Sequence, residues 1–351
     1  MSRSIIYSFL VALVSLGFMA CDSDDNGKQT KVPEGAKPST EFKLGDCEDE
    51  ANAKDAIKLV VNNWGDQGDQ DFASIELFAD GHFLITTPKA GKLPKRAASA
   101  TRSANIFKKH GDAPLKTRAT DINGTIDLEN GAYIYGTFTR VKEGVYSLSN
   151  NTMIEIKGYH VSGSTTIIYT NRYGVKIVVA VTVDFDYKPK PAVRQLCRSW
   201  RMDSSELWLT TEDTYIAYVK QWLKLGRVMQ EVTITPEGRA MGFDEDDVAE
   251  DKDDYCLRLV FSPCGTYLCF YKDGEVEVGF WEWKDLQNGV MRLWEPFDID
   301  DDDDDDDDVD EYMDVTVRFD GKKMRVYHDF MDEENDVMFR AYGVSTFSAR
   351  Y

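Results

Sequence analysis

Short runs of β-branched and aromatic residues recur along this chain with glycine turns between them, and this pattern favours strands over helices. The clearest runs occupy residues 136–138, 144–148, 153–156, 279–283, 290–294 and 315–319. Residues of these types fit a pleated, half-buried surface better than a helix. Short runs at intervals of about 8–12 residues predict a β-sandwich or barrel.

Two turns predict hairpins within this pattern. Gly81 and Gly265 each stand between apolar runs, and glycine tolerates the positive φ that a tight turn requires. In the second hairpin, a turn at residues 262–265 would bring Cys269 opposite Leu259 rather than opposite Cys256.

The chain of 351 residues has room for two domains, and alternating prolines at residues 188–191 suit a linker between them. Similar elements follow in the same order on both sides. We therefore expect an all-β fold with two antiparallel barrels or half-open sandwiches. The expected organisation is a signal peptide (1–20), a lipidated amino terminus with a flexible tether (21–51), a first β domain (52–188) with a basic insert (88–120), and a second β domain (192–351) with acidic loops (244–254 and 298–314).

One segment of the second domain, about residues 211–225, is predicted to be an amphipathic helix. Its apolar residues recur at helical spacing: Tyr215, Ile216, Val219, Trp222 and Leu223. Thr210 with Asp213 could cap its start, and Gly226 could end it. We expect the helix to pack across one face of the second domain, since its polar face is not basic enough to favour a membrane surface.

The amino terminus carries an export signal. Residues 5–18 form an apolar run that is too short to span a bilayer and has the length of a signal-peptide core. The run is followed by Ala20 and Cys21, a small residue directly before a cysteine, which resembles the lipobox read by lipoprotein signal peptidase. This resemblance implies cleavage before Cys21 and lipidation of its thiol, with the membrane as the first partner.

The residues after Cys21 sharpen the predicted location. The acidic stretch 22–25 resembles the export signal of Bacteroidota surface lipoproteins, whereas in enteric bacteria Asp22 would imply retention at the inner membrane. The former implies an outer-membrane lipoprotein facing the cell exterior. Residues 26–40 are polar and contain two prolines, so we expect them to remain an unpacked tether.

The second half resembles the lipocalin-like domains of Bacteroidota lipoproteins. The resemblance rests on a Leu and a Trp at the first strand, a Phe-Ser-Pro-x-Gly-Thr-Tyr hairpin, a Gly-x-Trp-x-Trp strand and a final hairpin, at residues 196–200, 261–267, 279–283 and 315–327. It covers residues 192–351 and extends loosely to residues 52–188. It implies barrels that can hold a small apolar ligand, and it carries over no catalytic residue.

Charge is distributed unevenly. The net charge of −21 disfavours nucleic acid as a partner. Nine consecutive aspartates begin at Asp300 and end at Asp308, and they repel one another. Because the run lacks the alternating ligands and the glycine of an ordered calcium loop, we expect at most weak cation binding there.

No catalytic residue, cofactor or metal ligand set is predicted. The four histidines are scattered, and Glu282, between two tryptophans, is expected on the solvent side of a strand. The five cysteines after Cys21 are expected to be small buried thiols, with their pairing left open. We expect a surface lipoprotein that binds a small apolar ligand or an envelope partner. A structural or adhesive component using the charged loops is the alternative, and a glycan-acting enzyme a distant third.

Replacing Cys21 with Ala is expected to release the protein from membranes, because the lipid would have no attachment atom. Cell fractionation followed by immunoblotting measures the partition between membrane and soluble fractions. Unchanged membrane partitioning of Cys21→Ala would contradict lipid anchoring.

Overall fold

A computed structural model of the chain describes residues 33–38, 56–62, 72–88, 123–128, 131–158, 163–183, 195–211, 214–249, 251–294, 312–334 and 337–349. Within these ranges the chain forms strands β1 to β19 and two short helices, α3 (Pro236–Ala240) and α4 (Glu245–Val248). The strands belong to two sheets, one built before residues 188–191 and one after them.

The first sheet closes into a barrel of eight strands. Its order is β3-β2-β1-β9-β8-β7-β6-β5-β4, and β3 also pairs with β5, so β4 lies outside the closed ring. All pairings are antiparallel. The strands are β1 (Ile57–Val61), β2 (Ser74–Leu77), β3 (His82–Pro88), β4 (Gly124–Leu128), β5 (Gly131–Lys142), β6 (Val145–Leu148), β7 (Met153–Lys157), β8 (Gly163–Thr170) and β9 (Lys176–Val183).

The second sheet closes in the same way. Its order is β12-β11-β10-β13-β14-β15-β16-β17-β18-β19, and β10 also pairs with β19, which leaves β11 and β12 outside the ring. The strands are β10 (Ser199–Thr211), β11 (Tyr215–Lys224), β12 (Arg227–Ile234), β13 (Cys256–Phe261), β14 (Thr266–Tyr271), β15 (Val276–Asp285), β16 (Val290–Trp294), β17 (Met313–Asp320), β18 (Lys323–Glu334) and β19 (Val337–Ala349).

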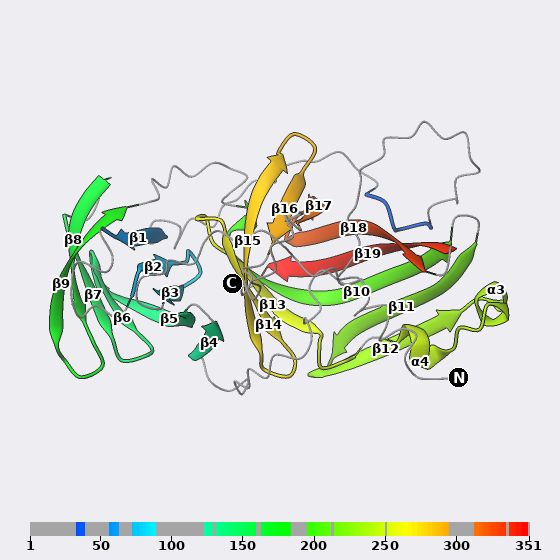
Figure 1. The fold of residues 1–351 in the computed structure, drawn as a ribbon, viewed down its shortest axis with the longest axis horizontal. Coiled ribbons are helices and arrows are strands. Elements are labelled where there is room, and N and C mark those ends of the chain that lie inside the picture. Colours follow the sequence, from blue (N-terminus) through cyan, green and yellow to red (C-terminus); the bar gives the residue numbers. More distant parts are fainter. Residues whose placement is uncertain are drawn as a thin grey trace, which may run out of the picture.

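One long strand organises each barrel. On one edge, β10 pairs with β19 along nearly all of its length; on the other edge, its first residues pair with β13 and its later residues with β11. In the first barrel, β5 is divided in the same way between β4 and β6, with β3 on its opposite edge. The later part of β10, with β11, β12 and the adjoining parts of β18 and β19, extends from the second barrel as a wing that carries α3 and α4 (Figure 1).

The predicted all-β class is confirmed, and both sheets are closed barrels rather than half-open sandwiches. Both predicted hairpins are present. Gly81 (φ +93°) and Gly265 (φ +89°) lie in the β2–β3 and β13–β14 turns, and Leu259 pairs with Cys269 as the turn required.

The predicted helix at residues 211–225 is wrong. Thr211 ends β10, and the apolar segment is strand β11, paired on both edges with β10 and β12. Thr210 lies inside β10, where its hydroxyl donates to the carbonyl of Arg340 instead of capping a helix. Gly226 does end the element, but as a hairpin turn with φ +76°. The segment is rich in residues that favour strands, and β10 and β12 supply hydrogen-bonding partners for its backbone on its two edges.

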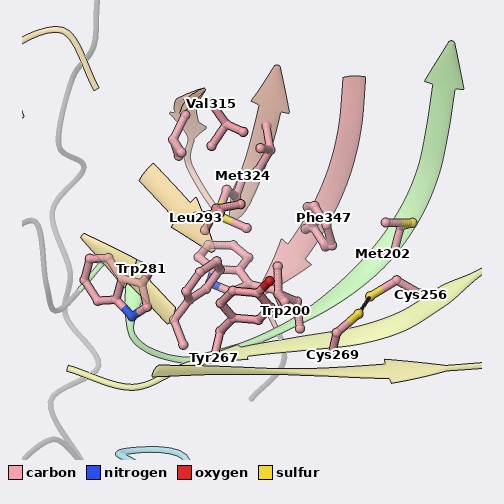
Figure 2. Close-up of a cluster of buried hydrophobic side chains, with 14 of the residues drawn as sticks. Trp200, Met202, Cys256, Tyr267, Cys269, Trp281, Leu293, Val315, Met324 and Phe347 are labelled. Carbon is pink, nitrogen blue, oxygen red and sulfur yellow. Dashed lines mark hydrogen bonds between the residues drawn. The ribbon is translucent and has the colours of Figure 1, made fainter. Parts of the chain in front are cut away.

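Large side chains fill the interior of the second barrel. Trp200, Phe261 and Phe347 are almost fully buried there in one apolar cluster, and Figure 2 shows the side chains of Trp200 and Phe347 within it. The Trp200 indole N–H donates to the carbonyl of Leu196 at 2.8 Å, so its polar atom is satisfied within the apolar core. The first barrel has its own core, which includes Leu59, Ile75, Phe83, Tyr146 and Ile167.

Part of the predicted tether packs against the second barrel. In residues 33–38, Ala36 is only 4% exposed and lies in a cluster with Trp208, Tyr327, Tyr342 and Val344 on the wing. The expectation that residues 26–40 stay unpacked is therefore wrong for residues 33–38. The polar composition of the segment gave no sign of this packing, because most of the apolar side chains in the contact belong to the sheet and not to the segment.

Trp200→Ala is expected to lower the free energy of unfolding by about 3–5 kcal/mol, because it leaves a large cavity in a filled core. Denaturant unfolding followed by circular dichroism measures the change. Leu225→Ala is the control: Leu225 is 96% exposed, and this change should stay within about 0.5 kcal/mol. Equal effects of the two changes would contradict a close-packed interior.

Candidate functional site at the seam between the barrels

An apolar seam joins the two barrels. Strands β3–β5 of the first barrel lie next to β13–β15 of the second (Figure 1). One buried cluster combines side chains of both, namely Phe78, Leu84, Tyr133, Tyr135, Val260, Leu268 and Val278. These strands place alternate residues in their own barrel core, so the cluster is built from the outward-facing residues. The barrels are therefore in direct contact through surfaces that each would otherwise expose to water.

A charged residue lies within this buried region. Glu76 on β2 is 2% exposed, and its carboxylate meets two hydroxyls of the β13–β14 hairpin of the other barrel. Ser262 Oγ donates to Oε1 of Glu76, and Thr266 Oγ1 donates to Oε2 at 2.9 Å. Ser262 also accepts the backbone N–H of Cys264 at 3.0 Å, which fixes the turn that presents it. A carboxylate of one barrel is thus hydrogen-bonded to two residues of the other.

Burial governs the acidity of this cluster. Desolvation raises the pKa of Glu76 above its ordinary value, while Lys58, its cross-strand neighbour, and the two hydroxyls act in the opposite direction. The thiols of Cys197 and Cys264 lie close enough that burial, and then the charge on Glu76, raise the pKa of each. Protonated thiols are weak nucleophiles. Because Ser262 and Thr266 are almost fully buried as well, the cluster lies inside the contact between the barrels, shielded from solvent.

A second contact closes the seam beside the β2–β3 turn. Asp80 Oδ2 lies 2.7 Å from Nδ1 of His82. The centre of the His82 ring lies 5.5 Å from the centre of the Phe270 ring on β14. The guanidinium of Arg258 lies 4.1 Å from the centre of the same Phe270 ring. His82 therefore contributes to packing between the barrels, and aromatic and cation–π contacts add specificity to the apolar seam.

Several predicted features fall outside the residues that the structure describes. These are Cys21, the aspartates from Asp300 to Asp308, and the basic insert apart from Pro88. The acidic stretch 244–254 is not wholly a loop, since Asp244 caps helix α4 by accepting the N–H groups of Asp246 and Asp247. Glu282 is exposed and pairs with Arg292 across β15 and β16, as expected for the solvent side of a strand.

The described ranges contain no group of three His, Cys, Asp or Glu side chains arranged to hold a metal ion. Nor do they contain a helix of the length and apolar character needed to cross a membrane.

Sequence reasoning missed the seam cluster. Glu76 stands between Ile75 and Leu77 in a short apolar strand, where an alternating charged residue is normally on the solvent side. Its hydrogen-bonding partners are 186 and 190 positions away in the sequence. The only local signal is that Phe78, next to this strand, adds an apolar residue that the first barrel's own core does not absorb.

Comparisons with known proteins assign this chain to no family. No protein-family model matches the chain, and no curated protein matches it. A point mutant of the vaccine antigen transferrin binding protein B from Haemophilus parasuis is similar over 81% of this chain and 62% of its own, with 6% identity and a TM-score of 0.19. This chain therefore spans less than two thirds of that structure.

A DUF3598-family protein of unknown function from Nostoc punctiforme is similar over 84% of this chain and 94% of its own, with 8% identity and a TM-score of 0.12. Likeness at this level transfers no function. The fold and the seam define the class: a β protein of two closed barrels joined side by side.

The contribution of Glu76 to the stability of the wild-type protein is expected to fall as pH rises from the unfolded pKa of glutamate, about 4.3, through the higher pKa of Glu76 in the folded state. Below that window Glu76 is protonated in both the folded and the unfolded state, so its protonation does not change the stability. Within the window the folded state binds more protons than the unfolded state, so rising pH favours unfolding. Glu76→Gln cannot ionise, and its stability relative to wild type should rise across the same window.

The pH series is measured by thermal unfolding of both proteins. Glu282→Gln is the control, since it removes a carboxylate that is exposed to solvent. Parallel stability curves for wild type and Glu76→Gln would contradict a buried, proton-linked Glu76.

Proposed function

We propose that this chain is a lipid-anchored, non-catalytic binding protein of the bacterial envelope, displayed outward, and that it binds a protein partner through the outer face of β7–β9. The observation that carries the proposal is an exposed apolar surface on this face of the first barrel. Its members are Met153, Tyr173, Val175 and Val178, whose exposures are 40%, 75%, 54% and 67%. We call this surface the β7–β9 face.

The strand register brings these residues together. Met153 pairs with Thr170, which pairs with Lys176; in the next row Glu155 pairs with Ile168, which pairs with Val178. Both rows lie on the outward side of the barrel, and Tyr173 and Val175 belong to the β8–β9 turn beside them. Apolar side chains gathered on one outer face are a common mark of protein contact surfaces.

The charge on this face is locally positive. Lys157 donates to Glu155 at 2.7 Å and lowers the pKa of that carboxyl, and the charges of Lys142 and Lys176 lower it further. Three lysines thus surround one glutamate, on a chain whose net charge is −21. A partner with acidic groups around an apolar centre is complementary to this arrangement. Exposed valine and methionine side chains favour a protein over a nucleic acid or a glycan.

The filled interior of the second barrel argues against the small apolar ligand expected from the lipocalin-like resemblance. An eight-stranded barrel is wide enough either for packed side chains or for one small ligand. The core around Trp200 already includes Tyr255, Phe261, Trp281 and Phe347. Surface contact therefore has more support than ligand enclosure.

The test is photo-crosslinking in the native host, with a photoreactive amino acid in place of Tyr173 and, as control, of Leu225. Leu225 is 96% exposed on the β11–β12 turn of the other barrel. We expect a discrete protein adduct from position 173 only, and we expect Val178→Glu to abolish it by placing a charge at the centre of the face. The absence of an adduct at position 173, or its persistence in Val178→Glu, would contradict the proposal.

Native mass spectrometry of the same preparation tests the competing function. A stoichiometric small molecule bound to the protein would favour a ligand carrier instead.

A further inference from the structure

Two thiols meet inside the second barrel. Cys256, the first residue of β13, and Cys269 on β14 have their Sγ atoms 2.9 Å apart (Figure 2). Both side chains are buried, with exposures of 0% and 1%. The separation exceeds the length of an S–S bond, about 2.05 Å, by less than about 1 Å.

The contact depends on an irregularity in β13. In the regular part of the hairpin Leu259 pairs with Cys269, so an uninterrupted ladder would pair Cys256 with Lys272, on the opposite face from Cys269. A bulge between Cys256 and Arg258 shifts the register, and Cys256 pairs with Tyr271 instead. Because residues 269 and 271 share the inward face, the bulge turns the Cys256 thiol into the core, diagonally beside Cys269.

The surroundings keep both thiols from external reagents once the barrel is closed. They lie in the same apolar cluster as Met202 and Tyr255. Burial raises the pKa of Cys269, and the adjacent Cys256 raises it further, so the thiolate that thiol–disulfide exchange requires is disfavoured in the folded state. A bond between them must therefore form while the hairpin is still accessible.

We propose that Cys256 and Cys269 form an intrachain disulfide as the second barrel folds. One thiolate attacks a small-molecule or protein disulfide and displaces one of its sulfurs as a thiolate. The second cysteine thiolate then attacks the mixed disulfide and displaces the other sulfur. Two S–H bonds are lost and one S–S bond forms, the two protons pass through water to the two displaced thiolates, and the two electrons reduce the oxidant disulfide to two thiols.

The bond would close a loop of residues 256–269 and fix the bulge at the start of β13. An oxidising compartment is needed in the cell, and the proposed envelope location would supply one. The chemistry itself does not rest on the proposed function, because the test uses purified protein and an added oxidant.

The full-length protein is unfolded in denaturant, refolded with oxidised and reduced glutathione, alkylated and digested with trypsin without reduction. Cleavage after Arg258 separates Cys256, in residues 253–258, from Cys269, in residues 259–272. We expect a covalent pair of these two peptides, absent after reduction. Cys264 shares the second peptide, so Cys264→Ser should retain the cross-link and Cys269→Ser should lose it.

The wild-type digest keeps the test decisive even if a variant does not fold. We further expect the oxidised wild-type protein to unfold roughly 6–12 °C above the reduced form of the same chain. Free thiols at both positions after oxidative refolding, or a cross-link that survives in Cys269→Ser, would overturn the proposal.

Discussion

The closure of each barrel by one long strand is the constraint on which the rest of this structure depends. Strand β10 pairs with β19 on one edge and is divided between β13 and β11 on the other, and β5 is divided in the same way. Closure decides which residues of every strand face inward, and therefore which remain for the seam. The length of β10 beyond its pairing with β13 also creates the wing that carries α3 and α4.

Joining two barrels through their outer faces requires some polar groups to leave water. Glu76 keeps hydrogen-bonding partners because Ser262 and Thr266 of the other barrel reach its two oxygens. A buried carboxylate with partners is costly to disturb, since removing one partner leaves the other group unsatisfied. The seam thus combines apolar area, which stabilises it without direction, with a polar contact that accepts only one alignment of the barrels.

The sequence predicted what short-range chemistry determines and missed what distant segments determine. The turns at Gly81 and Gly265, and the pairing of Leu259 with Cys269, followed from local turn preferences. The segment Tyr215–Lys224 was misjudged because an apolar stripe at helical spacing is also compatible with a short strand, and its pairing edges come from elsewhere. The thiol contact was missed because a bulge changes the facing of Cys256, and no local pattern encodes that bulge.

The packing of residues 33–38 on the wing has a consequence for the reach of the molecule. Only 12 positions separate Cys21 from Pro33, a contour of at most about 40 Å. With the proposed lipid at Cys21, this linker is shorter than a tether that stays unpacked as far as residue 51. It would hold the wing end close to the bilayer and restrict tumbling. The first barrel would then be restricted to a thin layer near the membrane, which raises its effective concentration for partners on the same surface.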